Sequence, residues 1–164
     1  MRNKVTIGSL NTDDITALRE LFKNSGPYVT QRGTSDYWLY TRLFSNTCLG
    51  AKDGENLIGA LLSFCDQTKS NTELYIQDIA VSPQNQGHGV GESLLKEIIH
   101  RTKFVGITKI WLTSEAENDK AIQLWLKYGF ENKKADYIKD DLWVTRDLKG
   151  PGRDRIVYSL DLND

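Results

Sequence analysis

Three glycines, each separated from the next by one residue, stand between a predicted strand and a predicted helix. They belong to residues 86–91, Gln-Gly-His-Gly-Val-Gly, which we call the glycine loop. Glycine tolerates backbone torsions that other residues resist, and it lets a ligand come close to the main chain. A helix that begins there directs its free N–H groups and the positive end of its dipole at the same point. The glycine loop is therefore predicted to bind an anion, and a pyrophosphate suits it.

Other interpretations of the glycine loop fit less well. A dinucleotide-binding GxGxxG loop would require an early βαβ unit and an acidic residue roughly 20 positions further on. A P-loop would require Lys followed by Ser or Thr after the glycines, and this pair is missing. A plain tight turn remains as the structural alternative, but such a turn does not need three glycines, which lose chain entropy on folding.

Hydrophobic spacing predicts the elements that carry the loop. Residues 73–81 (ELYIQDIAV) form a strand that Pro83 ends, and apolar residues at helical spacing follow Gly89. Upstream, we expect a strand at residues 5–10, a helix that Gly26–Pro27 ends, and a short second helix within residues 28–46. Residues 47–52 and 56–64 form a hairpin around Asp53 and Gly54.

The downstream half continues the alternation of strands and helices. A strand is predicted at residues 107–113, a helix at 121–128 closed by Gly129, a strand from Phe130, a long polar segment, and a last strand at 155–162. The order β-α-α-β-β-β-α-β-α-β-β predicts an α/β fold, α+β in some schemes. Its mixed sheet has helices on both faces and is parallel around the crossover between residues 73 and 113. A ligand crevice is expected at the carboxyl end of strand 73–81.

Length and composition limit the class of protein. The 164 residues predict a single domain over 1–164, and a net charge of −1 gives no general field for nucleic acid or an anionic membrane. No apolar run approaches the roughly 20 residues of a membrane span, and the first ten residues lack the apolar core of a signal peptide, so a cytoplasmic protein without a membrane partner is expected. Two cysteines in separate apolar segments indicate buried thiols, and only two histidines argue against a metal site.

Two segments resemble the signatures of the GNAT acetyltransferase superfamily. Residues 81–95 (VSPQNQGHGVGESLL) are similar to its Gln/Arg-x-x-Gly-x-Gly/Ala motif, with Gln86, Gly89 and Gly91 on the pattern. Residues 118–130 (NDKAIQLWLKYGF) resemble its second signature, Asn-x-x-Ala-x-x-x-Tyr-x-Lys-x-Gly-Phe. The resemblance covers the whole chain in element order and residues 73–130 in motif.

The resemblance implies acetyl-coenzyme A as cosubstrate, with no metal, and acetyl transfer to a primary amine. Backbone amides of the loop would then hold the pyrophosphate, and main-chain groups of two strand residues, together with one residue at the start of the later helix, would contact the pantetheine arm. The implied cofactor-binding residues are Gln86, Gly87, His88, Gly89, Val90, Gly91, Ile79, Val81 and Asn118.

Catalytic candidates lie in the same strand. The amine must lose a proton, for which a carboxylate or an ordered water can act as base. Asp78 is the acidic candidate, with a solvated or salt-bridged strand carboxylate as the alternative. Gln77 stands where some family members carry a glutamate base. Alternation sends these two side chains to opposite faces unless a bulge intervenes.

Trp125 stands where the family usually has a tyrosine that protonates the leaving thiolate. Indole is a donor only and does not release its proton usefully. Either Tyr128 or a water supplies that proton, or none is needed, because a thiol with a pKa of about 8.5 leaves tolerably well. Trp125 is counted among the cofactor-binding residues, and a packing role is favoured over a catalytic one.

The acceptor is expected to be a small amine: a diamino acid, a polyamine or an aminoglycoside-like compound. Aromatic and acidic residues gather in segments 25–46 and 135–154, which suits an ammonium group through cation–π contacts and ion pairs, although ordinary packing explains them too. Residues 35–48 (SDYWLYTRLFSNTC) also resemble the N-terminal region of diaminobutyrate acetyltransferases. A protein N-terminal or lysine acetyltransferase and a non-catalytic acetyl-CoA-binding module are the alternatives, and both a monomer and a homodimer stay open.

Overall fold

The computed structural model describes residues 4–115 and 117–163. It divides into two compact units. The first unit comprises the residues up to Phe64 together with Ile76–Val105, and the second comprises Cys65–Tyr75 together with the residues from Gly106 onward. Each unit is described by itself, and the single domain expected from the sequence stays a prediction.

The strands of the first unit follow the order β1-β2-β3-β4. They are β1 (Thr6–Ser9), β2 (Leu49–Asp53), β3 (Asn56–Cys65) and β4 (Glu73–Val81), of which Cys65 and residues 73–75 belong to the second unit. β1 pairs antiparallel with β2, and β2 pairs antiparallel with β3. Gly54, in the turn between β2 and β3, has a φ of 61°, which explains why a glycine stands in this hairpin. The expected hairpin is therefore present.

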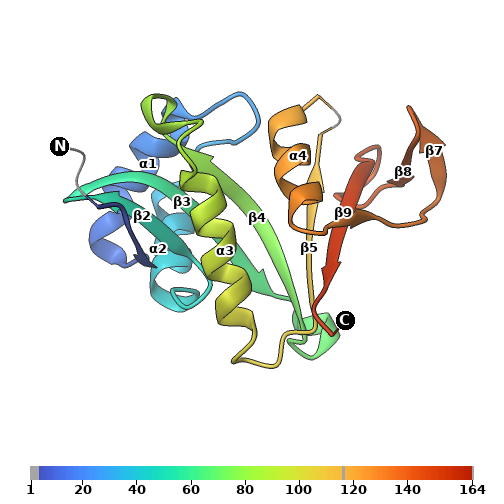
Figure 1. The fold of residues 1–164 in the computed structure, drawn as a ribbon, viewed down its shortest axis with the longest axis horizontal. Helices are drawn as coiled ribbons and strands as arrows, with labels where there is room; N and C mark the ends of the chain where they lie inside the picture. Colours follow the sequence, from blue (N-terminus) through green and yellow to red (C-terminus); the bar gives the residue numbers. More distant parts are fainter. Residues whose placement is uncertain (1–3, 116, 164) are drawn as a thin grey trace. The chain divides into compact units, whose positions relative to one another are not determined.

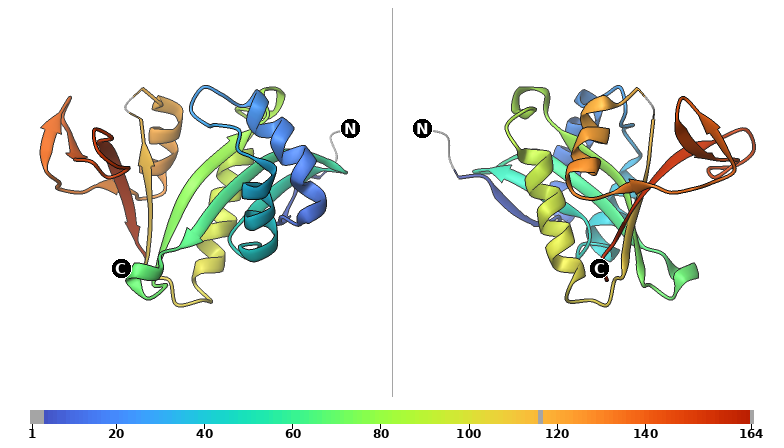
Figure 2. Two further views of the ribbon diagram at one scale, coloured as in Figure 1. Left: turned by 180° about the vertical axis from the view of Figure 1, so that it is seen from behind. Right: turned by 45° about the vertical axis from the view of Figure 1, so that its right-hand side comes forward.

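Helices pack on both faces of these strands, as Figures 1 and 2 show for α1 (Ile15–Asn24), α2 (Thr34–Leu43) and α3 (Val90–Thr102). A short 3₁₀ turn (Thr12–Asp14) precedes α1. It is closed by a capping box in which Asn11 accepts from the Asp13 N–H and Asp14 accepts from the Asn11 N–H. Leu18 and Phe22 of α1 and Tyr37 of α2 share one buried cluster with Ala80 of β4.

The side chains of β4 alternate between the two helical layers. Ile76 and Ala80 are buried, and Ala80 lies in the cluster with α1 and α2. A Cβ on Gly91 of α3 would lie 3.7 Å from Val81 Cγ2 and 3.8 Å from Ile79 Cγ2. The even-numbered side chains from residue 76 to 80 therefore face α1 and α2, and the odd-numbered ones face α3.

Gly59 of β3 brings the strand unusually close to the beginning of α3. A Cβ at this position would lie 2.8 Å from Val90 Cγ1 and 3.3 Å from both Leu94 Cδ1 and the Ala80 carbonyl oxygen. The absence of a side chain at residue 59 is thus what allows the first turn of α3 to rest on β3.

The second unit is built around a long antiparallel pair. Its strand order is β5 (Lys109–Ser114), β9 (Arg155–Asp161), β8 (Leu142–Thr145) and β7 (Tyr137–Lys139), with β6 (Glu131–Asn132) also paired to β9. Helix α4 (Asp119–Lys127) ends at Tyr128, and Gly129 follows with a φ of 83°. A residue in this left-handed conformation commonly closes a helix, so the expected closure by Gly129 is present.

Segment 135–154 is more ordered than the sequence indicates. We expected a long polar segment, and the structure has a β7–β8 hairpin there. The turn residues Asp140 and Asp141 have φ values of 48° and 64°, as a two-residue hairpin turn requires. The hydroxyl of Tyr137 donates to Asp154 Oδ2 at 2.6 Å and fixes the hairpin to the next loop. The order of the other elements agrees with the expected mixed α/β fold.

Candidate active site

Residues 82–85 connect β4 to the glycine loop, and hydrogen bonds hold this connection in place. The Ser82 N–H donates to the Ile58 carbonyl at 2.9 Å, and Asn85 Nδ2 donates to Ser82 Oγ at 2.8 Å. Gln86 Nε2 donates to the Val81 carbonyl at 3.1 Å, so this side chain ties the loop to the last residue of β4. The position of the loop is therefore set by the strand that precedes it.

The amino end of α3 leaves its amides available to a ligand. Gly89 is the N-cap with a φ of 79°, and no side chain caps the first turn. A Cβ at Gly87 or Gly89 would have no heavy atom within 4 Å, so the space beside both residues is open. Glu92 in the first turn would repel an anion, but it pairs with Lys96 at 3.3 Å. The loop and helix end fit a pyrophosphate group.

Asp78 lies on the face of β4 toward α1 and α2, in an ion pair whose partner, Arg32, the sequence did not identify. Arg32 Nη2, from the segment between α1 and α2, donates to Asp78 Oδ2 at 2.9 Å. The exposed fractions of the two side chains are 28% for Arg32 and 9% for Asp78. Burial by itself would lower the pKa of Arg32, but the hydrogen bond and charge of Asp78 outweigh it and raise that pKa. The Arg32–Asp78 pair is thus a charged group within a half-buried environment.

Two tyrosines of α2 complete this environment. The Tyr37 hydroxyl accepts a hydrogen bond from the Arg32 backbone N–H at 3.1 Å, and Tyr37 is fully buried. Burial raises the pKa of Tyr37 and of Tyr40, and the charge of Arg32 opposes the rise in both. Both hydroxyls therefore stay neutral at physiological pH.

The predicted strand residues divide between the two faces of β4. Gln77 and Ile79 lie on the α3 face, opposite Asp78, so the pair Gln77 and Asp78 cannot act on one atom from the same side. The Val81 carbonyl accepts from Gln86 Nε2 at 3.1 Å and from Ser25 Oγ at 3.3 Å. The single hydroxyl proton of Ser25 goes mainly to the Leu21 carbonyl at 2.6 Å, so Gln86 is the principal side-chain donor to the Val81 carbonyl.

Asn118 and Trp125 belong to the second unit, whereas the glycine loop and Asp78 belong to the first. Asn118 caps α4, with Oδ1 accepting from the Ala121 N–H at 3.4 Å. Trp125 is 7% exposed and packs against Phe130 with a ring separation of 5.9 Å. Its Nε1 is buried and has no acceptor among the residues that the structure describes. The burial supports the packing role, and the unsatisfied N–H is a donor that a bound ligand could use.

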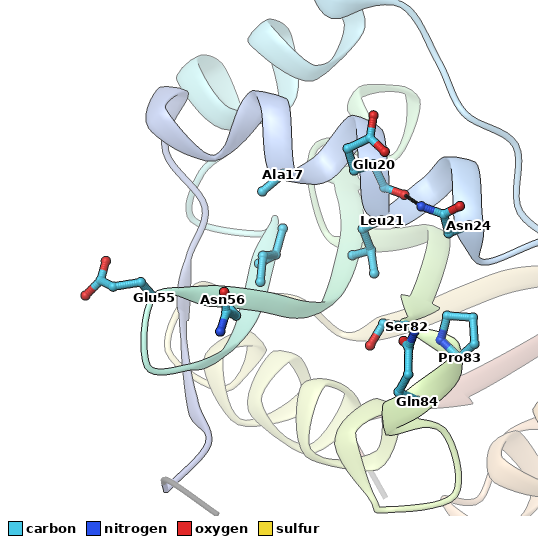
Figure 3. A pocket seen from close by; sticks show the side chains of 10 residues that line it. Ala17, Glu20, Leu21, Asn24, Glu55, Asn56, Ser82, Pro83 and Gln84 are labelled. Carbon is cyan, nitrogen blue, oxygen red and sulfur yellow. Dashed lines mark hydrogen bonds between the residues drawn. The ribbon is translucent and has the colours of Figure 1, made fainter.

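A pocket of about 490 Å³ is lined in part by the connection from β4 to the loop (Figure 3). Three segments line it: α1, the β2–β3 turn with the first residues of β3, and the residues directly after β4. They contribute Ala17, Glu20, Leu21, Asn24, Glu55, Asn56, Leu57, Ser82, Pro83 and Gln84. The pocket contains neither Asp78 nor the glycine loop, so it is separate from the candidate active site.

Within residues 4–115 and 117–163, no helix is both long enough and apolar enough to cross a membrane. The same residues contain no group of three or more His, Cys, Asp and Glu side chains that could hold a metal ion.

A family comparison decides the class of protein. The model of the acetyltransferase (GNAT) family matches residues 15–130, which include both signature segments, the loop and β4. The chain belongs to this family. The expected family, the expected α/β fold class and the expected acetyltransferase class are thereby confirmed.

Similar GNAT proteins differ in their acceptors. An L-2,4-diaminobutyric acid acetyltransferase of Vibrio cholerae is 25% identical over 150 residues, covering 92% of this chain and 86% of that protein. A ribosomal protein bS18-alanine N-acetyltransferase of Escherichia coli is 27% identical over 165 residues, covering 96% of this chain and 98% of that protein. The structure of a diaminobutyrate acetyltransferase of Paenibacillus lautus, in complex with L-2,4-diaminobutyric acid and coenzyme A, has a TM-score of 0.80 at 18% identity and covers 99% of this chain and 98% of that one. The structural likeness shows the fold.

Proposed function

We propose that the chain is an acetyl-CoA-dependent N-acetyltransferase that acts on the primary amine of a small molecule. The observation that carries the proposal is the glycine loop, which stands directly after β4 and presents the uncapped amino end of α3. On the other face of the same strand, Asp78 offers a carboxylate to an amine. One strand thus supports both the group that would bind the cosubstrate and the group that would receive the acceptor.

Acetyl-CoA supplies an activated acetyl group whose carbonyl carbon the amine attacks. In our proposal, amides of residues 87–91 bind the pyrophosphate, and main-chain groups of Ile79 and Val81 align the pantetheine arm. These contacts come from the backbone, so they hold the reacting end at a fixed height along β4. The cofactor-binding roles of Asn118 and Trp125 stay predictions.

Asp78 receives or relays the proton that the amine loses. Its ion pair with Arg32 stabilises the charged carboxylate, so proton transfer to Asp78 is less favourable than to an isolated carboxylate. Direct proton transfer therefore requires the pair to loosen when the acceptor binds. If the pair persists, a water ordered by Asp78 carries the proton away, and Asp78 acts by orienting the ammonium group.

The choice of a small amine rests on the diaminobutyrate relatives and on the resemblance of residues 35–48 to them. A protein N-terminus is the second candidate acceptor, supported by the similarity to the ribosomal protein acetyltransferase. The expected cellular location and oligomeric state stay predictions.

A thiol-release assay tests the proposal. The purified protein is mixed with acetyl-CoA and, in turn, L-2,4-diaminobutyrate, other diamino acids, polyamines, an aminoglycoside, and peptides that begin with alanine. The proposal expects release of coenzyme A with at least one small amine at a kcat/KM that exceeds the value for every peptide. Turnover of peptides alone would replace it with the second candidate, and no turnover in a protein that binds acetyl-CoA would indicate a non-catalytic module.

A further inference from the structure

The guanidinium group of Arg32 has more donors than the fold uses. Arginine carries five N–H donors, and among the described residues the guanidinium of Arg32 donates from Nη2 to Asp78 Oδ2 at 2.9 Å. Its Nε is buried and has no acceptor among the described residues. A buried donor without an acceptor is unusual in a native protein, and a ligand group is one way to satisfy it.

Arg32 is held in place by the helix that follows it. The backbone N–H of Arg32 donates to the Tyr37 hydroxyl at 3.1 Å, and the next N–H, of Gly33, donates to Asp36 Oδ2 at 3.1 Å. Both acceptors lie in the first turns of α2, so the backbone that carries Arg32 is fixed before any ligand arrives. Preorganisation of this kind reduces the entropy lost on binding. With 28% of its side chain exposed, Arg32 is also within reach of solvent.

The charges at this point favour an acceptor that carries both signs. A plain ammonium group would have to compete with Arg32 for Asp78. An acceptor with a carboxylate beside its amine could instead satisfy Arg32 and Asp78 together. The phenol groups of Tyr37 and Tyr40 are neutral neighbours, and the carboxylate of Asp36 is engaged by Gly33. The two phenols add no charge, and the Asp36 carboxylate adds a negative one that already accepts the Gly33 N–H.

We propose that Arg32 determines acceptor specificity by binding the carboxylate of an amino-acid acceptor, while Asp78 faces its amine. This inference rests on the proposed small-molecule function and narrows its substrate class to amino acids with a reactive primary amine. A guanidinium group suits this task because its planar donors match the geometry of a carboxylate.

The test compares two acceptors that differ by one carboxylate. L-2,4-Diaminobutyrate and 1,3-diaminopropane share the same three-carbon diamine skeleton, and only the first is an amino acid. Initial rates with saturating acetyl-CoA give kcat and KM for the unaltered protein and for Arg32→Gln, Arg32→Lys and Arg42→Gln. Arg42 is an exposed arginine near the end of α2, so its variant is the matched control for loss of one positive charge.

We expect Arg32→Gln to raise the KM for L-2,4-diaminobutyrate about 10- to 100-fold, as loss of a hydrogen bond between charged groups does, with kcat changed less than about threefold. The kcat/KM for 1,3-diaminopropane should stay within about threefold or rise, because Asp78 loses its competing cation. The KM of Arg32→Lys for L-2,4-diaminobutyrate should lie between that of the unaltered protein and that of Arg32→Gln, since lysine keeps the charge and loses the planar donors. Arg42→Gln should behave as the unaltered protein.

Equal losses with both acceptors in Arg32→Gln and Arg32→Lys would overturn the inference, because they would show that the pair only supports the fold. An unaltered protein that uses both acceptors equally well would also overturn it, while leaving the proposed function in place. If the protein acetylates peptides and neither diamine, both the inference about Arg32 and the proposed small-molecule function are wrong.

Discussion

Replacement of Gly89 by valine separates the contribution of the glycine loop to cofactor binding from its contribution to folding. Gly89 has a φ of 79°, a conformation that costs a residue with a side chain about 1–2 kcal/mol. No heavy atom lies within 4 Å of the position of a Cβ there, so the fold itself does not obstruct the side chain. A pyrophosphate bound at the amino end of α3 would meet it. The variant should therefore fold with reduced stability and bind acetyl-CoA poorly.

Gly106 supplies a matched control. Its φ is 72°, a Cβ there also has no heavy atom within 4 Å, and it lies outside the glycine loop. Valine at residue 106 should thus impose the same backbone strain without touching the ligand. For a chain of 164 residues, 1 kcal/mol shifts Tm by roughly 2–4 °C, so each variant alone should melt about 2–8 °C below the unaltered protein.

The two variants should differ once acetyl-CoA is added. At a concentration of about 100 times Kd, a ligand stabilises a protein by about 2.7 kcal/mol. If Gly89→Val raises Kd about 100-fold, the same concentration stabilises it by only about 0.4 kcal/mol, and the thermal shift nearly disappears. Gly106→Val should keep the full shift. Calorimetric titration gives Kd directly. An unchanged affinity in folded Gly89→Val, or an equal loss in Gly106→Val, would refute the role assigned to the loop.

Three further changes test other parts of the molecule. Asp78→Asn should lower kcat/KM by roughly 10²–10⁴-fold; a loss below about threefold across pH 6–9 would assign the deprotonation to another group. Trp125→Phe should change the single-turnover rate by less than about tenfold, or about 1.4 kcal/mol, because the ring is packed against Phe130. A hundredfold fall with fold and cofactor affinity intact would instead mean that Nε1 contacts the reacting groups. Burial raises the pKa of the Cys48 thiol to about 12, so a thiol reagent at pH 8 should label the half-buried Cys65 first, and both alike after denaturation; labelling of Cys48 at the same rate in the folded protein would contradict this.

Local sequence signals account for the part of the fold that carries the loop. β4 has the predicted bounds of residues 73–81, because buried and half-buried residues alternate along it and Pro83 cannot continue the strand. Gly89 is the N-cap of α3 because a residue without a side chain can take the left-handed conformation there. Both features depend on neighbours in sequence, which is why they are readable without a structure.

The β7–β8 hairpin lacked such a local signal. Hairpin turns with two left-handed residues usually contain Asn-Gly or Asp-Gly, and this one has Asp140 and Asp141. The carboxylates made the segment look like a polar loop, although Ile138, Trp143 and Val144 flank the turn. Asp residues tolerate the left-handed conformation, and that property was the signal available.

Arg32 could not be found by pattern because its partner is distant in sequence. It lies 46 residues from Asp78, and the ion pair exists because the segment between α1 and α2 returns to the middle of β4. The aromatic and acidic residues of segment 25–46 predict only that an ammonium group could bind there. Arg32, which pairs with Asp78, is the more specific guide to the acceptor, and the fold is needed to find it.

Gly59 lies outside the glycine loop, yet its lack of a side chain determines how close the loop and the start of α3 come to the sheet. Any side chain at residue 59 would press on Val90, the first residue of α3, and on Leu94 one turn later. The helix end and its amides would then have to rise, or β3 would have to bend. Natural variation or laboratory evolution that enlarges residue 59 should therefore alter the affinity for the cosubstrate without any change in the loop. A mutant library confined to residues 86–91 would overlook this means of adjustment.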